Sequence, residues 1–320
     1  MNSERRPRIT VKSLSLDQVK TWVTSPYNLY MKLQDGRFVT VFRLGSPIDQ
    51  ERLAKYAAKG VTSFYASEQD LDALGTEDGA LAVASSSNRL DALEKISQTV
   101  FDDLLSLGVS EAAYNNAKAV SKVVRSMVEK DPKLSDAFAK FQEVAAGDVR
   151  HAMMVSAMST VLCSSMDWVK PATYENLALG GLLHDIGMLS LPKDLQDGDL
   201  SKMSANDRKI FEGHAESGRA LLIQLKAVPD DVAMIVAHHH ERSDGSGYPL
   251  GLKDIYIHPL ARVVGLANEL VELFEADRDA GRATSVRLLV EGLINSQASR
   301  FNRDVIKSLR ALLASDTLKR

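Results

Sequence analysis

The sequence has very little cysteine, no long apolar run and almost no net charge, and each absence excludes a class of protein. Its single cysteine, Cys163, rules out a framework of intramolecular disulfides and favours a reducing compartment. No window holds the roughly 18 uninterrupted apolar residues of a transmembrane helix. Arg5, Arg6 and Arg8 are not followed by the apolar core of a secretory signal. We therefore expect a cytoplasmic protein without a membrane-spanning helix.

The charge balance excludes a class of partner. Lys and Arg number 39 and Asp and Glu number 42, so the formal net charge is −3. A protein that binds a nucleic-acid polymer needs an excess of basic residues facing the phosphates, and this chain has no such excess. Its composition, with 45% apolar and 25% charged residues, is ordinary for a globular protein, and 320 residues suffice for two domains.

Residues 1–75 are predicted to form a small α+β module. Residues 29–34 alternate apolar and polar side chains, as in a strand, and Asp35-Gly36 is a hairpin signal before a second strand at 38–42. The module contains no histidine and no catalytic spacing. It is therefore either a regulatory or protein-contact module or a structural appendage. A helix and a third strand are expected at 47–59 and 61–66.

From residue 89 onward the pattern is helical. Residues 76–88, rich in Gly, Ala and Ser, are predicted to be a linker, and residues 89–320 an all-helical bundle. The fold class is therefore mainly α with a small α+β N-terminal domain. The first helical stretches either pack on the bundle or form the seam of a homodimer. Further helices are predicted at 115–129, 149–166, 176–184, 204–214, 230–240, 259–274, 285–295 and 304–313.

Three adjacent histidines, His238, His239 and His240, are followed closely by the glycine-rich segment Gly245-Ser-Gly-Tyr-Pro249. Adjacent imidazoles are costly to hold together unless something shares their lone pairs, and a metal ion does so. Gly245 and Gly247 allow positive φ or a close approach to a ligand. Taken alone, the stretch is either a metal-binding segment or a solvated helix end that leads into a turn.

A second stretch, Leu182-Leu-His-Asp-Ile-Gly187, places His184 and Asp185 in an apolar setting. Buried His and Asp side chains need partners, and a metal ion would supply them. All seven histidines lie beyond residue 150, and His151, His184 and His214 each fall on a separate predicted helix. Facing helices of a bundle can direct such side chains to one site, so the second domain is predicted to bind metal.

Together the two motifs resemble the HD-GYP family over roughly residues 95–310. His-Asp stands about fifty residues before His-His-Glu-Arg-x-Asp-Gly-x-Gly-Tyr-Pro-x-Gly-Leu. Members of this family are HD-superfamily phosphodiesterases that hydrolyse cyclic di-GMP. The resemblance implies a helical HD-type fold. It also implies two transition-metal ions, iron or alternatively manganese, that assist hydrolysis of the substrate to pGpG or GMP.

The family's ligand positions carry over to this chain one by one. Asp185 falls on the catalytic carboxylate that bridges the two metals, and Asn268 falls on the last ligand, which is normally an aspartate. His238 and His258 match no ligand position and are expected to be structural. The positions that match the ligand set are His151, His184, Asp185, His214, His239, His240 and Asn268.

Other positions are expected to border the substrate. Met188 stands where the family usually has a lysine that contacts substrate phosphate. The remaining expected residues belong to the loop after the histidine motif, namely Arg242, Gly245, Gly247, Tyr248 and Pro249.

The chain also departs from the family pattern. Asn268 offers a neutral carbonyl oxygen in place of a carboxylate, and Met188 removes a positive charge. Gly147 replaces a glutamate that holds a third metal in some members, which favours two metals. Residues 276–279 replace the usual Arg-Pro-Tyr element. These departures weaken the expectation of catalysis and leave the expected fold intact.

Three functional hypotheses follow from the resemblance. The first is a binuclear cyclic di-GMP phosphodiesterase, and the second is a degenerate member that keeps the metal site but acts as a nucleotide sensor or interaction module. Met188 and Asn268 favour the second. A phosphohydrolase for another nucleotide is the third, and the Gly-Tyr-Pro motif argues against it. The expected partners are cyclic di-GMP or a related nucleotide, and a signalling protein that contacts the Gly-Tyr-Pro loop or the N-terminal module.

Overall fold

The computed structural model describes residues 11–20, 25, 28–33, 38–42, 48–67, 111–128, 133–134, 139, 147–196, 202–282 and 285–317. The chain divides into two compact units, residues 1–87 and residues 88–320. Each unit is described by itself. The predicted linker at 76–88 and the first predicted helical stretch, which begins at residue 89, lie outside the described residues.

The N-terminal unit is a small α+β fold, as predicted. Its four strands form an antiparallel sheet in the order β1-β4-β2-β3, and the predicted pair of strands at 29–34 and 38–42 is confirmed as β2 and β3. The edge strand β1 was missed, because only Val11 and Leu14 are apolar in it. The elements are β1 (Val11–Ser15), α1 (Leu16–Lys20), β2 (Leu29–Lys32), β3 (Phe38–Phe42), α2 (Gln50–Ala58) and β4 (Ser63–Ser67).

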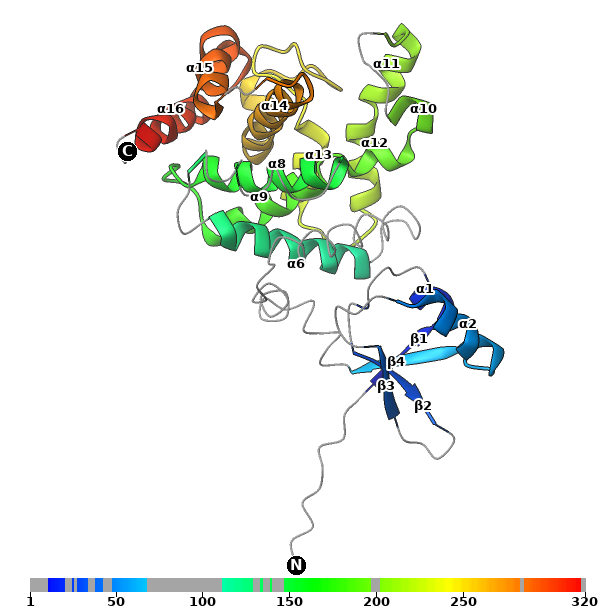
Figure 1. The fold of residues 1–320 in the computed structure, drawn as a ribbon. Helices are drawn as coiled ribbons and strands as arrows, with labels where there is room; N and C mark the ends of the chain where they lie inside the picture. The colour runs from blue at the N-terminus through cyan, green and yellow to red at the C-terminus, as the bar shows by residue number, and fades with distance from the viewer. Residues whose placement is uncertain are drawn as a thin grey trace, which may run out of the picture. The chain divides into compact units, whose positions relative to one another are not determined.

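The second unit is a helical bundle (Figure 1), which confirms the predicted fold class. Its α-helices are α6 (Glu111–Val128), α8 (Asp148–Cys163), α9 (Pro171–Leu183), α10 (Lys193–Gln196), α11 (Ala205–Glu212), α12 (His214–Leu222), α13 (Asp230–His238), α14 (Pro259–Asp279), α15 (Val286–Gln297) and α16 (Arg303–Thr317). Three short 3-10 helices join them, η1 (Ile186–Ser190), η2 (Asp254–Tyr256) and η3 (Ala298–Arg300). No described helix is long and apolar enough to cross a membrane.

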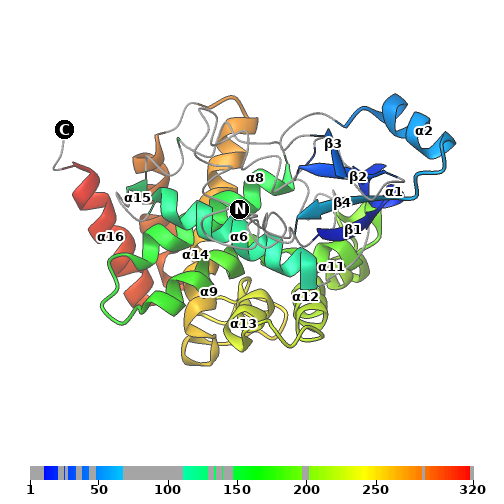
Figure 2. The ribbon, with the colours of Figure 1, turned by 90° about the horizontal axis from the view of Figure 1, so that it is seen from below.

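The centre of the bundle is built on α8 and α9, which pack side by side (Figure 1). Helix α8 also packs on α14 and α6, and α13 packs on α9, α12 and α14; Figure 2 shows α12 and α13 as neighbours. Thirteen residues of α8 are buried, among them Met153, Met158 and Cys163, so the methionine stripe and the cysteine belong to the core, as predicted. A helix buried on nearly all sides positions its polar residues firmly.

One predicted helix was wrong in its boundary. A single helix was expected at 204–214, but the helix is interrupted at Gly213. Helix α11 therefore ends at Glu212 and α12 begins at His214. The predicted start is confirmed, because Ser204 Oγ accepts a hydrogen bond from the Asp207 backbone N–H at 3.2 Å. Because of the break, His214 stands at the first turn of a new helix.

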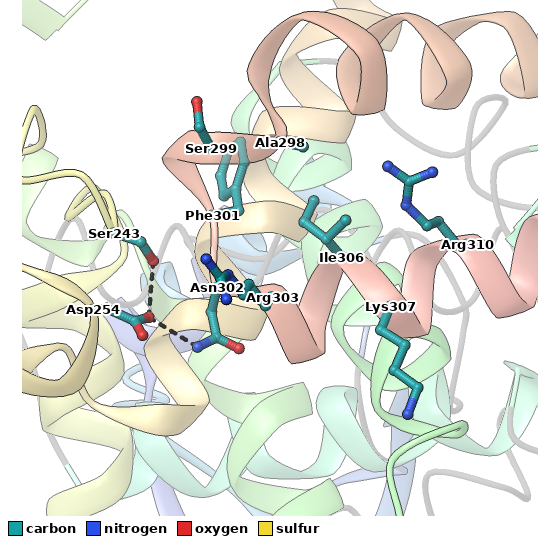
Figure 3. A pocket seen from close by; sticks show the side chains of 10 residues that line it. All are labelled: Ser243, Asp254, Ala298, Ser299, Phe301, Asn302, Arg303, Ile306, Lys307 and Arg310. Atoms are coloured by element: carbon teal, nitrogen blue, oxygen red, sulfur yellow. Dashed lines mark hydrogen bonds between the residues drawn. The ribbon is translucent and has the colours of Figure 1, made fainter.

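The segment after α13 is anchored at both ends. Glu241 is buried and its carboxylate accepts the backbone N–H groups of Leu250 and Leu252, each at 2.7 Å. Further along, Asp254 accepts from Ser243 Oγ at 3.1 Å and from Asn302 Nδ2 at 2.8 Å (Figure 3). These contacts lie at the edge of a hollow of about 540 Å³ between the loop and α16. The loop is therefore fixed to the C-terminal helices.

Candidate metal centre

Asp185 lies at the meeting point of three histidines from three parts of the bundle. Its Oδ2 is 3.0 Å from His184 Nε2, and its Oδ1 is 3.3 Å from both His214 Nε2 and His239 Nε2. His184 is the C-cap of α9, His214 opens α12, and His239 is the C-cap of α13. Three helix ends thus direct their imidazoles to one carboxylate.

The donor atoms form two groups that share Asp185. In each group, the possible ligand atoms lie within 4.8 Å of one another. Donor atoms bound to one metal ion at about 2.0–2.2 Å lie roughly 3 Å apart when they are adjacent, so these separations suit metal binding. One group consists of Asp185, His214, His239 and His240, and the other of His151, His184 and Asp185.

Main-chain carbonyls orient the three histidines around Asp185. His184 Nδ1 lies 2.8 Å from Gly181 O, and the Nδ1 atoms of His214 and His239 make the same contact to the carbonyl three residues earlier, at 2.7 and 2.8 Å. A carbonyl only accepts, so each Nδ1 carries the proton and each Nε2 presents its lone pair to the site. This is the tautomer that a metal ligand needs.

The chemistry of this donor set fits a divalent transition metal. His184 Nε2 is buried and forms no hydrogen bond with a described residue, although Asp185 Oδ2 lies 3.0 Å away. A lone pair that faces a carboxylate oxygen is repulsive unless a cation or proton lies between them. Burial lowers the pKa of His239 to about 4, which keeps its ring neutral at physiological pH. Neutral imidazoles with one shared carboxylate suit iron, manganese or zinc.

The charge of Asp185 is stabilised by the surrounding histidines. Burial alone would raise the pKa of its carboxyl group, but protons on the facing Nε2 atoms, that of His184 first, hold the pKa well below 3.8 when they stand where a cation would bind. Its side chain still has 39% exposure, so the carboxylate lies at the accessible floor of the site. An ionised, solvent-accessible carboxylate that lies between two groups of imidazole nitrogens can bridge two cations.

The ring of His151 is held by side chains and not by backbone carbonyls. His151 Nδ1 lies 2.8 Å from Glu275 Oε2, and the other oxygen of Glu275 accepts from Arg150 Nε at 3.2 Å. On its other edge, His151 Nε2 is 2.8 Å from Asn268 Oδ1. The amide Nδ2 of Asn268 in turn donates to Glu272 Oε1 at 2.7 Å. Asn268, which stands at the expected last ligand position, therefore contacts His151.

The electrostatics of these side-chain contacts favour a positive charge near His151. Burial would lower the pKa of His151, but the hydrogen bond to Glu275 and the nearby Asp185 carboxylate raise it to about 9. Both ring nitrogens of His151 face oxygen acceptors, Glu275 Oε2 and Asn268 Oδ1. Only a proton or a metal ion on Nε2 makes the contact to Asn268 favourable.

The loop after the histidines closes over His240. Tyr248 stacks on the His240 ring with centroids 4.4 Å apart, and the Tyr248–Pro249 bond is cis. Gly247 comes so close to the preceding segment that an added Cβ would be 2.4 Å from His240 O, and Gly245 has a φ of +84°. The glycine-rich loop therefore borders the site, with its aromatic ring against a candidate ligand.

The remaining expected substrate residues differ in position. Arg242 is buried and pairs with Glu269 at 2.8 Å, so its charge is used inside the protein. Met188 lies in η1 and is half-buried. His238 and His258 stay outside both metal groups: the His258 backbone N–H contacts His238 Nδ1 at 3.3 Å, and the His258 ring pairs with Asp231.

Sequence reasoning missed four glutamates around the site. Three of them, Glu269, Glu272 and Glu275, lie on α14 at spacings of three residues, and the fourth, Glu241, holds the loop. The spacing was visible in the sequence as charged residues within an apolar helix. The partners of Glu269 and Glu275 lie far away in the chain, so only the packed structure identifies what these two residues hold.

Gly187 allows two backbone segments to approach closely. An added Cβ would lie 1.8 Å from the carbonyl oxygen of His214, and Gly218 is the next neighbour. The backbone of η1 therefore touches the first turn of α12 directly. This contact places Asp185 next to His214, and only glycine permits it.

A helical bundle with a histidine–aspartate pair at its centre defines the class of HD-type folds. The HD domain family matches this chain over residues 103–305, and the chain belongs to that family. A solved structure of Bd1817, an HDG"Y"P protein from Bdellovibrio bacteriovorus, matches with a TM-score of 0.56 and 20% identity over 95% of this chain and 99% of the other. At that identity, the match supports the fold.

Curated relatives with phosphodiesterase names match part of this chain. The cyclic di-GMP phosphodiesterase PA4108 of Pseudomonas aeruginosa is 31% identical over 40% of this chain and 30% of its own length. The response regulator RpfG of Xanthomonas campestris, a cyclic di-GMP phosphodiesterase, is 35% identical over 29% and 25%. The 3'3'-cGAMP-specific phosphodiesterase 1 of Vibrio cholerae is 33% identical over 31% and 23%.

These matches confirm the HD-GYP resemblance. The matched regions span less than a third of the length of these curated relatives.

Proposed function

We propose that the second unit is a binuclear metal-dependent phosphodiesterase that hydrolyses a cyclic dinucleotide. The observation that carries the proposal is the position of Asp185, which faces His184 with one oxygen and His214 and His239 with the other. A carboxylate shared by two groups of imidazoles is the arrangement required for two neighbouring cations. The HD domain family membership and the phosphodiesterase names of the relatives support the same reaction.

The two metal ions would be held by separate groups that share one residue. Asn268 joins the group of His151 through its Oδ1, while Asp185 belongs to both groups. Bound there, iron or manganese would polarise phosphoryl oxygens and lower the pKa of a water molecule. The chain's own residues orient the ligands: backbone carbonyls fix His184, His214 and His239, and Glu275 fixes His151.

Cyclic di-GMP is the substrate that we favour. Two of the relatives described above are named for cyclic di-GMP and one for 3'3'-cGAMP, so the substrate class is a cyclic dinucleotide with two phosphodiester bonds. Tyr248 and the glycines beside it form one border of the site. Met188 adds no charge there, so the metals would carry most of the attraction for the phosphates.

The test is a hydrolysis assay on anaerobically purified protein loaded with Fe²⁺ or Mn²⁺. Cyclic di-GMP and 3'3'-cGAMP are supplied separately, and the products are resolved by chromatography. We expect conversion of cyclic di-GMP to pGpG or GMP, and none with the Asp185→Asn variant. Full metal loading with nucleotide binding but no turnover would replace this proposal by the degenerate sensor hypothesis.

Other expectations stay predictions. They are the cytoplasmic location, the regulatory role of the N-terminal unit, a protein partner at the Gly-Tyr-Pro loop and a homodimer seam.

A further inference from the structure

Asn268 is held between two partners of different chemistry. Its Oδ1 lies 2.8 Å from His151 Nε2, and its Nδ2 donates to Glu272 Oε1 at 2.7 Å. Glu272 follows one turn later on α14, so the two side chains share a helix face. Asn268 is buried, whereas Glu272 borders the solvent. The amide thus connects the partly buried His151 to an exposed carboxylate.

The direction in which this amide points decides whether it can bind metal. An asparagine side chain has one acceptor oxygen and one NH₂ group that only donates, and the two ends are nearly equal in size. A carboxylate only accepts hydrogen bonds, so Glu272 pairs with the NH₂ end of Asn268. The oxygen of Asn268 is then left facing His151 and the candidate metal group.

Glu272 also brings charge to this part of the site. Its carboxylate is one hydrogen bond away from Asn268, and the residue is exposed. Hydrogen bonds in a chain polarise one another, so an ionised Glu272 increases the negative character of the Asn268 oxygen.

We propose that Glu272 is a positioning residue of the metal centre. It turns the oxygen of Asn268 toward the metal held with His151, and it supplies, one hydrogen bond away, the negative charge of an aspartate ligand. The inference rests on the proposed function, because it presumes a metal ion in that group. Asn268 is then one half of an amide–carboxylate pair, and the departure from the family pattern is not the loss of a ligand.

A double-mutant cycle tests this dependence. Metal affinity is measured by chelator competition with Mn²⁺ on the full chain, for the natural sequence, Glu272→Gln, Asn268→Asp and the double variant. In the natural background, Glu272→Gln should weaken the affinity of one site by about 10-fold, since a glutamine can present either end to Asn268. With Asn268→Asp, the orientation no longer matters and two carboxylates repel. There Glu272→Gln should leave the affinity unchanged or tighten it.

The outcomes separate the inference from the proposed function. A loss of similar size in both backgrounds would overturn the positioning role, because Glu272 would then act independently of Asn268. No loss in either background would overturn it as well. If the natural protein and Asn268→Asp bind no metal, the proposed function itself fails and the inference falls with it.

Two controls distinguish a lost orientation of Asn268 from a general loss of the fold. Glu291→Gln removes an exposed carboxylate that pairs with Arg287 on α15, at 2.8 Å, and should leave metal affinity unchanged. The melting temperature of each metal-free variant shows whether the fold is intact. A tenfold loss in Glu272→Gln with an unchanged metal-free melting temperature supports the positioning role.

Discussion

The two sides of the candidate metal centre are held by different means. Around His184, His214 and His239, the orienting groups are backbone carbonyls three residues earlier in the chain. Around His151, they are the side chains of α14, which lies more than 100 residues later. The first arrangement depends on helix geometry alone, whereas the second depends on which residues α14 carries. The second side is therefore the one that substitutions can tune.

The largest expected effect comes from removing the residue that both sides share. Asp185→Ala should lower metal content from about two ions per chain to nearly none, because each group then keeps only neutral donors. Elemental analysis of anaerobically prepared protein measures this. His258→Ala, a change outside both groups, should leave the metal content as it was. One full equivalent of metal retained in Asp185→Ala would show that the two groups are independent.

A substitution at Gly187 should disturb the group of histidines that backbone carbonyls orient. In Gly187→Ala the new Cβ would meet the carbonyl of His214 at 1.8 Å, so η1 and α12 must move apart. We expect the free energy of unfolding to fall by about 1–3 kcal/mol, together with weaker metal binding at the His214 group.

Gly292 provides the matched control for this experiment. It lies within α15, and a Cβ there would meet nothing within 4 Å. Gly292→Ala should be neutral or stabilising by up to about 1 kcal/mol. Denaturant titrations of both variants compare them. Equal stabilities would mean that the backbone contact between η1 and α12 is not as tight as described.

A substitution at Glu275 should weaken metal binding only at the group that contains His151. In Glu275→Gln the contact to His151 Nδ1 can persist but its charge is lost, so affinity at the His151 group should fall by about 10-fold. The other group, held by main-chain carbonyls, should keep its affinity. Chelator competition that resolves two metal sites measures both affinities. Equal weakening of both would show that the two groups are not held by different means.

The smallest expected effect concerns substrate capture. Met188→Lys would add a positive charge three residues after the shared carboxylate and should lower KM for cyclic di-GMP by up to about 10-fold, with kcat little changed. Steady-state kinetics at two salt concentrations measure it, because an electrostatic gain shrinks as salt rises. A change confined to kcat would show that Met188 acts on the chemical step.

The contrast also explains what the sequence could reveal. The clustering of His184, Asp185, His239 and His240 was predictable, because motifs of neighbouring residues mark them. The fold class was predictable from periodicity, and the N-terminal sheet in part, because β1 has little alternation. Helix ends were less certain: Gly213 divided a predicted helix, since it lies between two stretches of similar pattern.

The side-chain contacts around His151 could not be predicted. Asn268 appeared as a missing carboxylate, because a single aligned position does not show that Glu272 lies one turn away and binds the same amide. Sequence analysis did not identify Glu275, although it holds His151 from the neighbouring helix α14. The contacts of Asn268 and Glu275 with His151 depend on the packing of α8 against α14, which has no local sequence signal.

Metal stoichiometry tests the central claim most directly. The full chain is purified anaerobically, loaded with Fe²⁺ or Mn²⁺, freed of excess metal and analysed for metal and protein. Two groups of donors that share Asp185 predict about two ions per chain. Fewer than about one ion per chain would contradict the account, because the histidines would then be packed together without the cations that their lone pairs require.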